Sequence, residues 1–249
     1  MTALSENIAR LEDAICAACR VAGRDRSSVE LMAVSKTYPA ETIAEAAQLG
    51  LRLYGENRVQ EFAAKATGIE TLRRDSPDPI RVHLIGHLQS NKSARAVEIF
   101  DAVDSVDSLR LAERLNDAAA KLGKRIPVLI EVKISSEETK SGIAPESDEA
   151  ARLFECLPDF QQLETRGLMT IAPWGVAAEV TRDCFRRLRT YRDRWATAYP
   201  RLNFDVLSMG MSGDFALAIE EGATRIRIGT ALFGKRKPWP DNELRAGDE

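Results

Sequence analysis

The feature that most constrains the fold of this chain is an alternation of short apolar segments with amphipathic stretches, repeated eight times. Period-two or continuous apolar runs bounded by turn residues predict strands over 30–36, 51–57, 81–86, 101–105, 127–134, 164–171, 204–209 and 224–229. Helical spacing predicts helices over 39–49, 58–66, 90–98, 108–122, 147–157, 178–198 and 213–221, and one more helix before the first strand. Eight strand–helix units predict an α/β fold of the (β/α)8, or TIM, barrel type with an extra N-terminal helix.

The alternative architecture is an open doubly wound sheet, which carries a glycine-rich turn after its first strand. The first predicted strand here is followed by "SKTYPAET", which contains no glycine. A barrel of this type typically needs about 250 residues, and the chain has 249. No linker rich in Pro, Gly or Ser divides it, and "RRDSPDPI" (73–80) fits a surface loop. We therefore expect one domain over residues 1–249, with 235–249 as a polar tail.

The charge and hydropathy patterns exclude several classes of function. The formal net charge is −3, from 35 basic and 38 acidic residues, so no overall positive field favours binding to nucleic acid. The first residues, "MTALSENIARLEDAICAACR", lack the basic start and apolar centre of a secretory signal. No apolar stretch approaches the roughly 20 residues of a membrane-spanning helix. We expect a cytoplasmic protein without nucleic-acid or membrane partners.

Two cysteines, Cys16 and Cys19, form a CxxC pattern that could indicate a redox or zinc site. They fall on the helical repeat of Ile8, Leu11 and Ile15, and this spacing favours a packing role. The other cysteines and both histidines are scattered singly, whereas a zinc site needs four ligands. We expect no metal site.

The carboxyl ends of the predicted strands carry polar residues, and this is where barrel enzymes assemble their sites. The first strand ends in Lys36 and the second in Asn57. Lys36 has the same parity as Met32 and Val34, which directs it inward, where desolvation and nearby arginines would lower the pKa of its amine. An uncharged amine is a nucleophile toward aldehydes.

The last predicted strand directs two arginines, Arg225 and Arg227, toward the barrel interior, because the alternating isoleucines should face the helices. A buried guanidinium without a partner is costly, so each needs a carboxylate or a ligand. Glu131 on the fifth strand is a candidate partner. The alternatives are an internal salt-bridge network, chiefly for Arg225, or contact with a ligand near the mouth.

The last two strands are followed by residues suited to phosphate. "SMGMSGD" supplies Gly210, Ser212 and Gly213, and "IGT" supplies Gly229 and Thr230. Barrels commonly bind phosphate after these two strands, with backbone N–H groups and hydroxyls as donors. Ser212 could instead, or also, cap the following helix. A phosphate cradle facing an amine suggests pyridoxal 5'-phosphate, held as a Schiff base on Lys36.

In combination these segments resemble the pyridoxal-phosphate homeostasis proteins, which are related to the N-terminal barrel of alanine racemase. The matching segments occur in the family's order and are "AVSKTYP" (33–39), "YGENRVQE" (54–61), "HLIGHLQSNK" (83–92), "ETKSGI" (138–143), "RGLMTI" (166–171) and "LSMGMSGDFALAIEEGATRIRIGTALFG" (207–234). The resemblance implies pyridoxal phosphate on Lys36, a pocket wall at Asn57 and Arg227 facing the pyridine nitrogen. It assigns the phosphate to Ser208, Ser212, Gly229 and Thr230.

The resemblance further implies a monomeric carrier that acts in vitamin B6 homeostasis and supplies cofactor to apo-forms of pyridoxal-phosphate enzymes, rather than a catalyst. The alternative is a single-domain amino-acid racemase or isomerase that uses Lys36 and a second group such as His87. A nucleic-acid- or protein-binding barrel without cofactor is disfavoured by the acidic balance. Lys133 stands where many relatives have asparagine, and Lys140 matches a second family lysine; their roles are left open.

Overall fold

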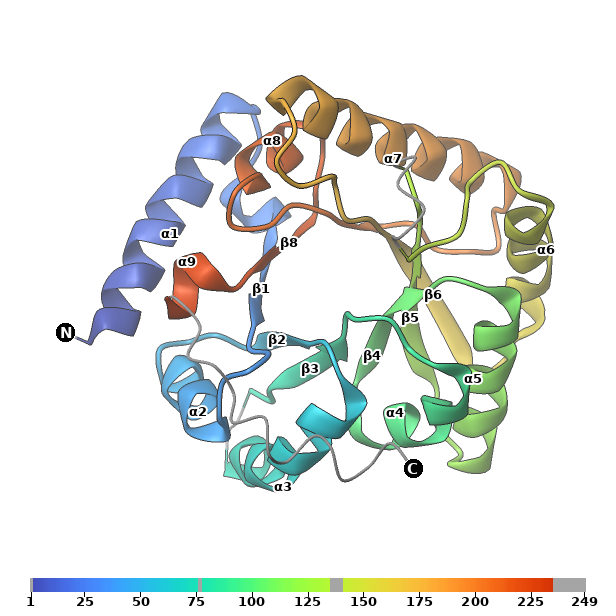
Figure 1. Cartoon of the computed structure of the whole chain (residues 1–249), viewed down its shortest axis with the longest axis horizontal. Helices are drawn as coiled ribbons and strands as arrows, with labels where there is room; N and C mark the ends of the chain where they lie inside the picture. The colour runs from blue at the N-terminus through green and yellow to red at the C-terminus, as the bar shows by residue number, and fades with distance from the viewer. Residues whose placement is uncertain (1, 76–77, 135–140, 235–249) are drawn as a thin grey trace.

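The computed structural model describes residues 2–75, 78–134 and 141–234, and it confirms the predicted barrel. Eight parallel strands close into a ring in chain order, with β8 pairing to β1 (Figure 1). The strands are β1 (Glu30–Val34), β2 (Leu53–Glu56), β3 (Arg81–Leu84), β4 (Ala102–Val106), β5 (Ile126–Glu131), β6 (Leu163–Met169), β7 (Val206–Ser208) and β8 (Arg225–Ile228).

Helices surround the strands (Figure 1). A continuous apolar core lies between the two layers. They are α1 (Ala3–Val21), α2 (Ala40–Gln48), α3 (Val59–Asp75), α4 (Ser93–Ile99), α5 (Leu109–Lys121), α6 (Asp148–Cys156), α7 (Ala178–Ala198), α8 (Phe215–Glu220) and α9 (Thr230–Phe233). The N-terminal helix α1 is present as predicted. Cys19 is buried in this core, which agrees with a packing role. No helix within the described residues is both long and apolar enough to cross a membrane.

Local signals account for several element boundaries. Ser108 caps α5 by accepting the Leu111 N–H at 3.3 Å, and Gly123 ends the same helix with a φ of 61°. The predicted end of the second helix at residue 66 is wrong, because α3 continues to residue 75. Ile69 on this extension is fully buried, so packing against the barrel offsets the cost of a glycine at position 68.

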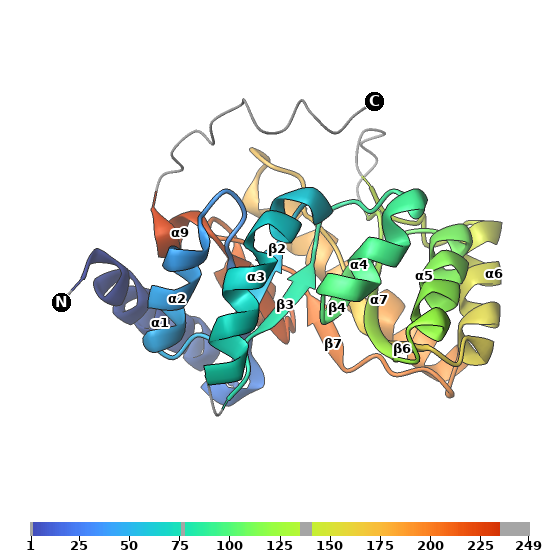
Figure 2. The ribbon, with the colours of Figure 1, turned by 90° about the horizontal axis from the view of Figure 1, so that it is seen from below.

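The inside of the barrel contains a small apolar cluster that is separate from the outer core. It consists of Met32, Val34, Leu53 and Ile85. Gly55 leaves room for two of them, since a Cβ at this position would lie 2.8 Å from Met32 Sδ and 2.9 Å from Ile85 Cδ1. Because all strands are parallel, their carboxyl ends meet on one rim, which we call the mouth; the arrows of β2 and β3 rise toward it in Figure 2.

Candidate functional site

The mouth brings together the residues that the sequence placed at strand ends. Lys36 follows β1, Asn57 follows β2, Ser208 ends β7, and Gly229 and Thr230 follow β8. In a closed parallel barrel these positions lie around a single opening, here after the consecutive neighbours β7, β8, β1 and β2. The structure therefore gathers these predicted site residues at one end of the molecule.

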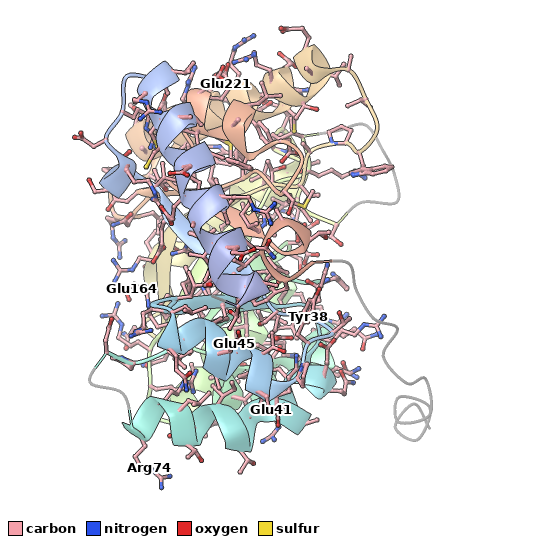
Figure 3. The ribbon with its side chains drawn as sticks, turned by 90° about the vertical axis from the view of Figure 1, so that its left-hand side faces the viewer. Tyr38, Glu41, Glu45, Arg74, Glu164 and Glu221 are labelled. Carbon is pink, nitrogen blue, oxygen red and sulfur yellow. The ribbon has the colours of Figure 1, made fainter. Side chains whose placement is uncertain are left out.

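Lys36 lies in a turn just beyond the end of β1 and is half-buried. The next residue, Thr37, has a φ of 68°, in the left-handed region that a β-branched residue rarely adopts. Its N–H donates to Glu61 Oε1, and Tyr38 packs on Phe233 with 5.0 Å between ring centroids. The Tyr38 hydroxyl also donates to the Gly234 carbonyl at 2.9 Å, so Tyr38 joins the start of α2 to α9 (Figure 3).

Arg227 is buried near the mouth and binds the ends of three strands together. Its guanidinium donates to Ser208 O at 2.7 Å, to Ser208 Oγ at 2.9 Å and to Thr170 O at 2.8 Å. Burial lowers the pKa of this guanidinium from its ordinary value, while Asp104, Glu131 and Asp214 oppose that effect. The inward orientation predicted for this arginine is confirmed, but its partners are β7 and the residue after β6 rather than Glu131.

Ser212 connects the loops that follow β7 and β8. Its Oγ accepts the N–H of Ala231, in the first turn of α9, at 3.3 Å. The alternative that Ser212 caps the next helix is wrong, because the N-cap position of α8 belongs to Asp214. The Asp214 carboxylate accepts the N–H of Met211 in the preceding loop. Burial raises the pKa of Asp214. Ser212 is therefore at the junction of the two loops, with Gly229 and Thr230 beside it at the start of α9.

These donors suit a phosphate group. The set combines serine and threonine hydroxyls with the backbone N–H groups at the junction of the two loops. The Arg227 guanidinium is linked to this set by its hydrogen bond to Ser208 Oγ. Neutral donors backed by a fixed positive charge are the chemistry that a phosphate dianion requires. Ser208 is fully buried and its Oγ accepts from Arg227, so its own hydroxyl proton is what it could donate while that bond is kept.

Asn57 is held close to β3 by a glycine. A Cβ at Gly86 would lie 2.2 Å from the Asn57 carbonyl oxygen, so no side chain fits there without moving the backbone. Asn57 is half-buried at the mouth. On the neighbouring rim segment, His87 is exposed and its Nδ1 lies 3.2 Å from Asp107 Oδ2.

Glu131 ends β5 as a buried carboxyl group near the mouth. Burial and, to a smaller extent, Asp107 raise its pKa to about 7, while Arg227 opposes the shift. Lys133 follows on the same strand end, half-buried, with its N–H donating to Ile143 O at 2.9 Å. Lys140 and the tail 235–249 lie outside the described residues.

We expect the charge on Glu131 to cost stability as the pH rises. A carboxyl whose folded-state pKa lies above its unfolded value of 4.5 keeps its proton in the native state, so native stability falls as the pH rises from about 4.5 through 7. Glu131→Gln should therefore be stabilising by up to the order of 3 kcal/mol at pH 8 and nearly neutral at pH 4.5. Urea unfolding at both pH values measures this difference, and an equal effect at both would contradict it.

Arg225 lies at the opposite end of the barrel and belongs to a separate ionic cluster. Its guanidinium contacts Glu30 Oε2 at 2.8 Å and Asp104 Oδ2 at 3.1 Å. His83 Nδ1 lies 3.1 Å from Asp104 Oδ1. Although burial opposes ionisation, His83 and Arg225 hold the pKa of Asp104 below its ordinary value. Arg225 is thus in the internal salt-bridge network weighed from the sequence, with Glu30 and Asp104 in place of Glu131.

Sequence reasoning missed a buried polar cluster behind the Lys36 turn, formed by Ser35, Glu56, Glu61 and Lys65. Glu56 ends β2 with a side chain that is 0% exposed, and Lys65 on α3 is 4% exposed. In the sequence, a Glu at 61 followed by a Lys at 65 predicts only an exposed i,i+4 ion pair on a helix surface. The only available signal was a charged residue, Glu56, at a strand position expected to be buried.

Comparison with known proteins agrees with this architecture. The family described as "Alanine racemase, N-terminal domain" matches residues 3–237. A pyridoxal phosphate homeostasis protein from Aquifex aeolicus is 41% identical over 93% of this chain and 98% of its own length. The homologous protein of the same name from Escherichia coli K12 is 42% identical over 95% of this chain and 98% of its own.

A solved structure gives the same result in three dimensions. PipY from Synechococcus elongatus, determined with PLP bound, superposes with a TM-score of 0.81 at 42% identity, over 93% of this chain and all of that one. This chain therefore belongs to the family of the pyridoxal phosphate homeostasis proteins, whose barrel is of the alanine racemase N-terminal type.

Proposed function

We propose that this protein binds pyridoxal 5'-phosphate through Lys36 and acts in vitamin B6 homeostasis and cofactor supply. The observation that carries the proposal is the placement, on one rim, of a half-buried lysine after β1 and of a hydroxyl and N–H donor set after β7 and β8. The names of the relatives and the PLP-bound state of PipY support it.

The residues present fit the cofactor at both of its ends. Pyridoxal phosphate supplies an aldehyde, which condenses with an uncharged lysine amine to a Schiff base with loss of one water. Lys36 would provide that amine. The phosphate would be held by Ser208, Ser212, Gly229 and Thr230, and Asn57 would line the pocket.

Arg227 favours storage of the cofactor over catalysis. In the proposed arrangement its guanidinium faces the pyridine nitrogen. Its attachment to Ser208 and Thr170 fixes it there, and a guanidinium stays protonated under all ordinary conditions. A guanidinium donates but does not accept hydrogen bonds, so it would not stabilise a protonated ring nitrogen, and an unprotonated ring leaves the cofactor a weak electron sink. We propose a single-domain, monomeric, cytoplasmic carrier whose partners are apo-forms of pyridoxal-phosphate enzymes.

The proposal is tested by locating the attachment site. Purified protein is incubated with pyridoxal phosphate or with pyridoxal, reduced with borohydride and analysed by peptide mass spectrometry. We expect the reduced adduct on the peptide that contains Lys36, at far lower occupancy with pyridoxal, because that vitamer has no phosphate to bind. Adduct spread over many exposed lysines, or equal labelling by both vitamers, would contradict the proposal.

A carrier should also hand its cofactor to a client. We expect the loaded protein to reactivate an apo-form of a pyridoxal-phosphate enzyme in the presence of a phosphatase that destroys free cofactor. Absence of reactivation under these conditions would argue against a role in supply.

A second candidate function, amino-acid racemisation, is favoured by one observation. His87 stands at the mouth beside Asp107, a pairing that orients an imidazole as an acid or base. A racemase needs such a group on the face opposite Lys36. Incubation with amino acids in deuterated water separates the two functions, since a racemase would introduce deuterium at Cα and a carrier would not.

A further inference from the structure

The turn that carries Lys36 is fastened from behind by two charged residues of α3. The Lys65 ammonium donates to the carbonyl of Ser35 at 3.3 Å and to that of Tyr38 at 2.9 Å. These carbonyls flank Lys36 and Thr37. Between them, the N–H of Thr37 donates to Glu61 Oε1. Three backbone groups of a four-residue turn are therefore bound by two side chains from a single helix.

The same two side chains are paired with each other and with β2. Lys65 Nζ lies 3.0 Å from Glu61 Oε1 and 2.9 Å from Glu56 Oε1, and the Ser35 hydroxyl donates to Glu56 Oε1 at 2.7 Å. The side chains of Glu61 and Lys65 are 9% and 4% exposed. Hydrogen bonds to charged groups that are shielded from water are stronger than those on a surface.

Such fastening is what the backbone of the turn requires. A left-handed conformation costs a residue with a Cβ roughly 1–2 kcal/mol, and the cost persists only where the surroundings determine the conformation. Thr37 adopts this conformation, and its N–H is the group that Glu61 binds. If the contacts to α3 were absent, Thr37 would relax toward an extended or right-handed conformation and would change the direction in which Lys36 leaves the turn.

We propose that Glu61 and Lys65 are positioning residues for Lys36. They hold the turn in its left-handed conformation, so that the amine is presented to the mouth before any ligand arrives. The inference deepens the proposed function and depends on it for the role of Lys36. Fixing a reactive group in advance lowers the entropy cost of attachment, which is the general benefit of preorganisation.

The first test needs no cofactor, because it follows hydrogen exchange at the Thr37 amide of the free protein. Glu61→Ala removes the acceptor of that N–H and Lys65→Met removes the donor to both carbonyls. A lost hydrogen bond to a charged group corresponds to roughly a tenfold to hundredfold faster exchange. Glu61→Gln keeps an oxygen acceptor and is expected to retain most of the protection. If the alanine and methionine variants fold poorly, Glu61→Gln still allows the exchange at Thr37 to be measured.

The second test measures how strongly pyridoxal phosphate attaches to the same variants. We expect about tenfold weaker attachment in Glu61→Ala and Lys65→Met, with recovery in Glu61→Gln. The matched control is Glu221→Gln. Glu221 is also a buried carboxylate, paired to Arg182 at 3.2 Å and to Arg189 at 3.3 Å, and it lies far from Tyr38 (Figure 3). This control should lose stability without a change in Thr37 exchange or in attachment.

The outcomes separate the two proposals. Unchanged Thr37 exchange in both Glu61→Ala and Lys65→Met overturns the positioning role, whatever the cofactor does. Faster exchange with unchanged attachment of pyridoxal phosphate also overturns the positioning role. The contacts to α3 would then stabilise the turn without affecting how Lys36 reacts. If pyridoxal phosphate attaches to a lysine other than Lys36, the proposed function fails, while the exchange result still reports on the turn.

Discussion

Replacing Lys36 with alanine is expected to abolish covalent attachment of pyridoxal phosphate while the barrel stays folded. Lys36 lies in a half-buried turn outside the hydrogen-bonded part of β1, so its side chain contributes little to the core. The buried lysine nearest in the chain, Lys65, cannot substitute, because its ammonium already donates to two carbonyls and two carboxylates. The absorption band of the Schiff base and the mass gained after borohydride reduction should both fall to background.

The matched control for this variant is Lys133→Ala. Lys133 is also half-buried and follows a strand end at the mouth, and its backbone is fixed by the bond to Ile143. Its replacement should leave the band and the adduct unchanged if Lys36 is the attachment site. An unaltered band in Lys36→Ala, or an equal loss in both variants, would contradict the assignment.

The largest expected effect on stability is that of Arg225→Met. The substitution keeps much of the side-chain volume but removes the guanidinium paired to Asp104, whose side chain is 1% exposed and keeps His83 as a neighbour. Removing one partner of a buried ion pair costs about 3–5 kcal/mol, because the remaining charge is uncompensated. Urea unfolding at pH 7 should show this loss in the free energy of unfolding.

A double variant tests the physical reason. Asp104→Leu combined with Arg225→Met removes both charges, and replacement of a whole buried pair by apolar residues is often neutral or stabilising. We expect the double variant to recover most of the stability lost by Arg225→Met alone. A double variant as unstable as the sum of its single changes would show that the ion pair is not the source of the loss.

The sequence predicts the barrel well because each strand–helix unit carries its own local signals. The inward orientation of Arg225 and Arg227 follows from strand alternation and is confirmed. The identity of their partners could not be predicted, because it depends on how far neighbouring strands are staggered around the ring. That stagger sets Arg225 beside Glu30 on β1 and directs Arg227 to carbonyl groups. Neither relation is encoded in any single strand.

The candidate site likewise contains residues that the sequence could predict and contacts that it could not. Residues that follow a strand are located at the mouth by topology alone, and this is why Lys36 and Thr230 could be named from the chain. The contact of Ser212 with Ala231 joins two separate loops, and the attachment of Lys65 to the Lys36 turn joins a helix to a distant backbone. Such contacts depend on tertiary packing, which local patterns do not report.

The bond from Tyr38 to Gly234 couples the segments that follow two neighbouring strands, β1 and β8. The turn after β1 carries Lys36 and the segment after β8 carries Gly229 and Thr230, so a displacement of one is transmitted to the other. Loosening of the segment proposed to hold the phosphate would therefore also disturb the turn that holds the amine.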